Sequence, residues 1–137
     1  MKNVFYTLGL LFIVIACSSQ RDSSNQKKKT AYQVQNDTIR IANDSLEYEI
    51  IIIEPGFYSW LATQPPRGFY SQSTLEIRNQ FRVREYNLRV RNPISYDPDL
   101  YIFSIDYENG IDYGYEVNYL LYNWFLFFEQ RYNQKLL

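Results

Sequence analysis

YLLYNWFLFF, at residues 119–128, is apolar on almost every side when it is wound as a helix. A helix without a polar face is normally buried, so this run predicts the centre of the domain. We expect the helix to extend from about Tyr115 to Tyr132. The run is too short to cross a bilayer, which takes about 20 apolar residues. Asn118 and Asn123 lie inside it, and because buried amides need partners, we expect them to join the core to a neighbouring loop.

A longer helix precedes this one. Ser73-Thr74-Leu75-Glu76 has the spacing of a capping box, which predicts a helix from Thr74 to about Arg91, ending before Asn92-Pro93. At about 100° per residue, its apolar residues fall on two arcs, one made of Leu75, Val83, Tyr86 and Val90 and the other of Ile77, Phe81 and Leu88. Two arcs predict a helix covered on two sides, once by its own domain and once by something else.

The same helix carries several arginines that an anionic polymer would attract. Glu85 lies four residues before Arg89 and three after Arg82. Ordinary ion pairs within a helix explain this spacing, and we favour that interpretation over a polymer-binding surface.

The predicted strands complete an α+β fold. Thr38–Ile41 alternates, and the β-branched run ending at Ile53 is typical of a central strand covered on both faces. Residues 57–61 predict a short helix. Tyr101–Tyr107 also alternates and predicts a third strand. Because Asn109-Gly110 is a hairpin signal, residues 111–115 could form a short return strand, although we favour a loop. We therefore expect a small three-stranded sheet, a hairpin plus one parallel strand reached by a right-handed crossover, packed with the long helix and the C-terminal aromatic helix.

The N-terminus has the pattern of a secretion signal. Residues 1–16 combine a basic start with a short apolar core, and Val14-Ile15-Ala16-Cys17 resembles the lipobox of bacterial lipoproteins. Cys17, the single cysteine, is then the expected lipid attachment site. Residues 17–36 are polar and predict a flexible tether, and 37–134 predict one globular domain.

This pattern also predicts a location. Acyl chains on Cys17 would hold the protein in a lipid bilayer, at about 0.8 kcal/mol per buried methylene. We expect a cell-envelope protein, anchored in the outer membrane and facing the periplasm. Ordinary secretion is the competing interpretation.

The composition argues against several functions. The chain has no histidine, which removes the commonest general base and metal ligand. Its 14 basic and 15 acidic residues are too balanced to suggest nucleic acid as a partner. We expect no enzyme activity, no cofactor and no metal. The carboxylates after the predicted strands, Glu54 and the group Asp106, Glu108, Asp112 and Glu116, have no spacing that singles out a catalytic pair or a calcium loop.

Two segments carry a family resemblance. Tyr48–Trp60, with Glu54-Pro55-Gly56-Phe57 inside it, and Tyr113–Asn123 are similar to a family of small bacterial lipoproteins characterised only as a domain of unknown function. The resemblance covers roughly residues 37–134. It implies no catalytic or binding residues.

Two functional hypotheses remain. The first is a structural or assembly lipoprotein that binds an envelope protein or itself, with Arg67, Tyr70, Phe81 and Leu88 as candidate surface residues. The second is a ligand-binding lipoprotein whose tyrosines stack on glycan or peptide. A flat apolar patch favours the first hypothesis, and a concave pocket lined by tyrosine favours the second.

Overall fold

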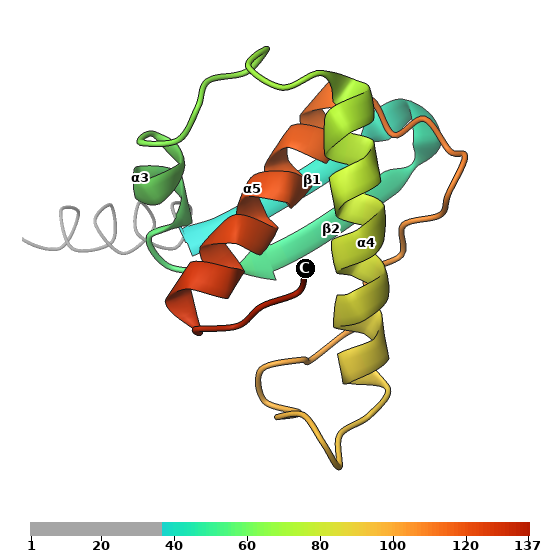
Figure 1. Ribbon diagram of the computed structural model, residues 1–137. Coiled ribbons are helices and arrows are strands. Elements are labelled where there is room, and N and C mark those ends of the chain that lie inside the picture. Colours follow the sequence, from blue (N-terminus) through green and yellow to red (C-terminus); the bar gives the residue numbers. More distant parts are fainter. Residues whose placement is uncertain (1–36) are drawn as a thin grey trace, which may run out of the picture. The chain divides into compact units, whose positions relative to one another are not determined.

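The computed structural model describes residues 37–137. This part of the chain is α+β: a two-stranded antiparallel sheet followed by three helices (Figure 1). The elements are β1 (Thr38–Asn43), the 3-10 turn η1 (Asp44–Leu46), β2 (Tyr48–Ile53), α3 (Phe57–Leu61), α4 (Gln72–Val90) and α5 (Tyr115–Arg131). In the register of the hairpin, Thr38 faces Ile53 and Asn43 faces Tyr48.

The aromatic helix is the centre of the core, as its sequence predicts. Figure 1 shows α5 lying over the hairpin with α4 beside it, and α5 contacts β1, α3 and α4. Leu121 and Phe125 have no exposed surface. The Tyr86 ring of α4 packs edge-on against Trp124 and Phe128 of α5. Aromatic pairs in this geometry add to the stabilisation that burial gives.

The prediction that β2 is a central strand covered on both faces is wrong. Ile50 and Ile52 point into the core with 8% and 5% of their surface exposed, whereas Ile51 is 56% and Ile53 75% exposed. Successive side chains of a strand point to opposite faces. Because only one face of the hairpin is covered by α5, the alternate isoleucines remain outside.

The predicted third strand and its parallel crossover are also wrong, since residues 101–107 form no strand. The side chain of Asn87 takes the place of a neighbouring strand. Its Oδ1 accepts from the N–H of Ile105 at 2.8 Å and its Nδ2 donates to the Ile105 carbonyl at 2.7 Å. The hydroxyl of Tyr48 donates to the carbonyl of Asp106 at 2.6 Å. Tyr101 and Ile105 are buried, but Phe103 between them is exposed, so the predicted alternation is incomplete, and side chains bond the backbone at Ile105 and Asp106.

The long helix begins two residues earlier than the capping box predicts. Ser71 is the N-cap, and its Oγ accepts from the N–H of Thr74 at 3.3 Å. The side chain of Glu76 does not bond the cap. It accepts instead from the Nε2 of Gln72 at 2.7 Å. The short helix α3 and the absence of a strand at 111–115 agree with the predictions.

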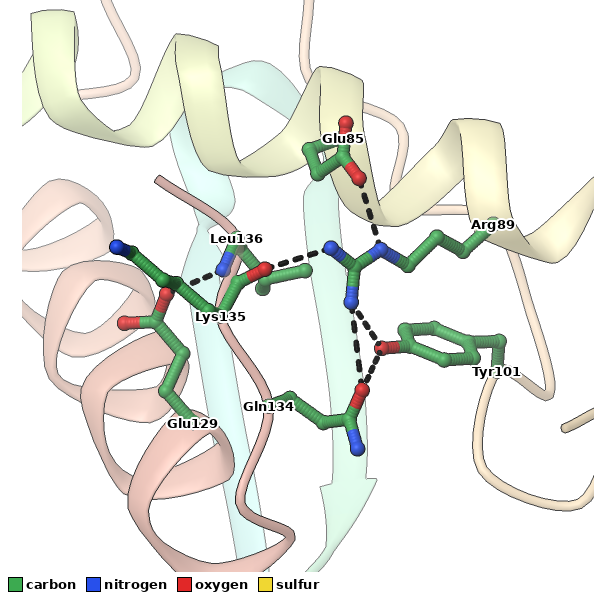
Figure 2. Close-up of polar contacts among 7 residues, drawn as sticks. All are labelled: Glu85, Arg89, Tyr101, Glu129, Gln134, Lys135 and Leu136. Carbon is green, nitrogen blue, oxygen red and sulfur yellow. Dashed lines mark hydrogen bonds and ion pairs between the residues drawn. The ribbon is translucent and has the colours of Figure 1, made fainter. Parts of the chain in front are cut away.

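The C-terminal tail is fastened to α4 by one arginine (Figure 2). Arg89 pairs with Glu85 at 2.8 Å and donates to the Tyr101 hydroxyl at 2.8 Å and to the Lys135 carbonyl at 2.6 Å. Next to this contact, the N–H of Leu136 donates to Glu129 at 2.7 Å, and the Leu136 side chain is buried. Residues after α5 are therefore part of the packed domain.

Candidate functional site

The second apolar arc of α4 forms an exposed strip. The first arc is packed into the domain, where Leu75, Val83 and Tyr86 are nearly inaccessible. The second arc is open: Ile77 is 56%, Phe81 48% and Leu88 45% exposed. Arg84 and Arg91 lie along the same line of the helix surface. We call Ile77, Phe81, Arg84, Leu88 and Arg91 the outer strip.

The arginines of α4 divide into two groups. Arg82 and Arg89 point inward: Arg82 pairs with Glu129 at 3.3 Å, and its guanidinium lies 5.4 Å from the centre of the Tyr122 ring. The predicted pair of Glu85 and Arg89 is confirmed, whereas Arg82 takes Glu129 as its partner in place of Glu85.

The outward group consists of Arg78, Arg84 and Arg91, all exposed. Within residues 37–137 none of the three takes part in an ion pair. The guanidinium carbon of Arg84 lies 5.3 Å from the centre of the Phe81 ring, so cation and apolar surface are in contact on the strip. Ion pairs within the helix therefore account for Arg89 but for none of these three arginines.

Arg67 and Tyr70 belong to a different part of the surface. Arg67 donates to Glu116 at 2.8 Å through Nε, lies 4.5 Å from the centre of the Tyr119 ring, and has its pKa raised by the hydrogen bond to Glu116. Tyr70 is half-buried against Tyr122, with ring centres 5.6 Å apart. These contacts hold the loop before α4 against the first turns of α5. Of the four candidate surface residues, Phe81 and Leu88 therefore lie on the outer strip, and Arg67 and Tyr70 do not.

In the described part of the chain, open hollows lie beside β2 and beside α4. One, of about 320 Å³, runs between β2 and residues 103–106, and the other, of about 380 Å³, lies between α4 and residues 107–112. Each is lined by one tyrosine, Tyr48 in the first and Tyr107 in the second. Both hydroxyls are engaged, Tyr48 with the Asp106 carbonyl and Tyr107 with Asn118 at 2.7 Å. Burial raises the pKa of both phenols.

The candidate carboxylates do not converge. Glu54 is buried, accepts from the Tyr132 hydroxyl at 2.7 Å and pairs with Arg131 at 3.3 Å. Asp112 accepts from Gln72 at 2.6 Å, and Glu116 holds Arg67. Asp106 and Glu108 are exposed. Over the described residues, no three acidic, histidine or cysteine side chains gather where they could hold a metal ion.

Sequence reasoning missed the polar contacts inside the domain. Asn79 is fully buried and donates to the carbonyl and Oδ1 of Asn118 at 3.0 and 3.1 Å, while its own Oδ1 has no partner. Asn118 accepts from the hydroxyl of the loop residue Tyr107 at 2.7 Å, as expected, whereas Asn123 donates to the Tyr119 carbonyl of its own helix at 2.8 Å and joins no loop, so the prediction is wrong for Asn123. Asn79 lies four residues after Leu75 and therefore on the buried side of α4. This spacing could have identified Asn79 as a buried polar residue.

The anchor predicted at Cys17 lies outside the described residues. From residue 37 onward, no helix is both long and apolar enough to cross a membrane.

Comparison with known proteins identifies the family of the chain. Searches of curated proteins and of solved structures found no significant similarity. A model of a family of unknown function (DUF6146) matches residues 5–137, which is nearly the whole chain. The chain therefore belongs to this family of unknown function, in agreement with the unknown-function family that its sequence resembles.

Proposed function

We propose that this protein is a bacterial lipoprotein of the cell envelope, anchored through an acylated Cys17, which acts by binding another envelope component and not by catalysis. The outer strip of α4 is its docking surface. The N-terminal pattern supports the anchor, because a basic start, a short apolar core and a small residue before the single cysteine occur together.

The exposure of Ile77, Phe81 and Leu88 carries the proposal. Each leaves about half of its side chain open, on a continuous helix whose opposite side is fixed in the core. Large apolar side chains gathered on one line of a rigid element are a common feature of interaction surfaces. An exposed apolar strip of this kind favours the binding-protein hypothesis over a tyrosine-lined ligand pocket, since each of the two described hollows has one tyrosine, whose hydroxyl is already bonded.

The arginines of the strip argue against pairing with a second copy. In a two-fold symmetric dimer the same patch meets itself. Arg84 and Arg91 of one copy would then face the arginines of the other, and like charges brought together in an interface are unfavourable. The component bound by the strip should instead carry negative charge.

A photo-crosslinking amino acid tests the docking surface in intact cells. We expect the reactive side chain at position 81 to form an adduct with an envelope component. The control is the same side chain at position 58, since Tyr58 is 38% exposed on α3, away from α4. Equal adducts at both positions, or no adduct at position 81, would contradict the proposal.

A further inference from the structure

We infer that the outer strip binds a surface of anionic phospholipid headgroups. This inference rests on the proposed docking role of the strip and names its partner. It is carried by three properties of α4: the alignment of the strip, the absence of exposed acid on the helix, and the position of both described hollows away from the strip.

The five residues of the strip lie on one narrow line. At about 100° per residue they fall within an arc of about 80°, and at about 1.5 Å per residue they extend about 21 Å along the helix. Arg78 lies to one side of this line. Two apolar side chains, Ile77 and Phe81, are therefore followed by Arg84, Leu88 and Arg91 along a straight ridge, which a planar surface can contact along its full length.

No carboxylate interrupts the positive charge. The exposed residues of α4 are Ser73, Ile77, Arg78, Phe81, Arg84 and Leu88. The two acidic residues of the helix are half-buried and engaged, Glu76 with Gln72 at 2.7 Å and Glu85 with Arg89 at 2.8 Å. The next exposed carboxylates along the chain, Asp97 and Asp99, lie in the loop beyond the helix.

The shape of the strip favours lipid over protein. A protein partner usually places its main anchoring side chains in well-packed pockets of the surface that it binds. Neither described hollow includes a residue of the strip. An interfacial helix needs no pocket, because its apolar side chains enter the headgroup boundary while its cations remain at the phosphates. The contact of Arg84 with the Phe81 ring places a cation directly beside an apolar side chain, as this mode requires.

The two attachments would reinforce each other. A lipid anchor keeps the domain close to the bilayer, so even a weak surface contact becomes effectively intramolecular. Contact of the outer strip with the bilayer would turn α4 toward the membrane. The hairpin face that carries Ile51 and Ile53 would then not face the membrane.

Vesicle binding tests the inference with lipid as the only possible partner. The probe is the chain from residue 17 onward with Cys17→Ser, so that no acyl group is attached, sedimented with vesicles of equal phosphatidylglycerol and phosphatidylcholine or of phosphatidylcholine alone. We expect at least tenfold tighter binding to the anionic vesicles. A basic residue near such a surface contributes about fivefold in affinity, so Arg84→Glu should weaken binding by about 30-fold. Phe81→Ser with Leu88→Ser should also weaken it.

The matched control is Lys135→Glu, an equal charge reversal at an exposed residue outside α4, which should change binding by less than about twofold. Circular dichroism establishes that each variant is folded. Equal binding to both vesicle types, or an equal loss in Arg84→Glu and Lys135→Glu, would overturn the inference. If the protein does not bind vesicles but forms a protein adduct at position 81, the lipid partner is wrong and the docking surface is retained. If no adduct of any kind forms at position 81, both proposals are wrong.

Discussion

Arg89 and Arg84 lie on the same helix but have different roles: Arg89 holds the C-terminal tail, and Arg84 is exposed on the outer strip. Replacing each in turn by methionine compares these roles. Arg89→Met keeps the length of the side chain and removes the guanidinium that holds the tail (Figure 2). The pair with Glu85, whose side chain is 33% exposed, contributes about 0.5 kcal/mol or less. The bonds to Tyr101 and Lys135 contribute about 1 kcal/mol each once their partial exposure is allowed for.

The expected loss for Arg89→Met is therefore about 2–3 kcal/mol in the free energy of unfolding, which lowers Tm by about 10–20 °C in a domain of this size. Urea unfolding followed by tryptophan fluorescence measures it, because Trp124 is buried beside Tyr86. Arg84→Met is the control and should change stability by less than about 0.5 kcal/mol, as exposed substitutions usually do. A loss below about 0.5 kcal/mol for Arg89→Met, or equal losses for both variants, would refute the division of the arginines.

Three further results are expected. Asn87→Ala removes both hydrogen bonds to the backbone of Ile105, so it should cost about 1–3 kcal/mol and speed hydrogen exchange at the Ile105 amide; unchanged exchange there would contradict the role of Asn87. Burial raises the pKa of Tyr86 to about 12, so the folded state favours the neutral phenol, and stability should be complete below about pH 10 and fall as the pH rises toward 12; a flat profile over that range would be inconsistent with this burial. Cys17→Ser should abolish the lipid mass shift and release the protein from membranes washed in high salt, and full retention after the wash would exclude the anchor.

The helices could be predicted from the sequence because their signals are local. The run at 119–128 is apolar on all sides, and only a buried helix accommodates it, so α5 was predictable almost to the residue. The two arcs of α4 likewise follow from spacing alone, and they separate Leu75 and Tyr86 in the core from Phe81 and Leu88 on the surface.

The sheet could not be predicted in the same way. The sequence at 101–107 alternates, but Phe103 is exposed, and the side chain of Asn87 bonds the backbone of Ile105 where a neighbouring strand was expected. The isoleucine run of β2 indicates a strand without showing how many faces are covered, which depends on the number of strands beside it. Both errors concern contacts between residues far apart in the sequence.

Only part of the candidate site could be predicted from the sequence, because the rest depends on contacts between distant residues. Phe81 and Leu88 stand out by their spacing, whereas the role of each arginine depends on a distant partner. Arg82 pairs with Glu129 and Arg89 with the tail, 47 and 46 residues away. Once these pairs are known, Arg84 and Arg91 remain as free cations beside the apolar residues of the strip.

Thiol labelling in native membranes is the most direct test of the outer strip. If Cys17 is acylated, Phe81→Cys supplies the single free thiol of the mature protein. We predict that a water-soluble maleimide labels position 81 much more slowly in intact envelopes than after detergent extraction, because the docked strip is covered, while Tyr58→Cys labels at similar rates in both. Equally fast labelling of positions 81 and 58 in intact envelopes would show that nothing covers α4 and would contradict the docking surface.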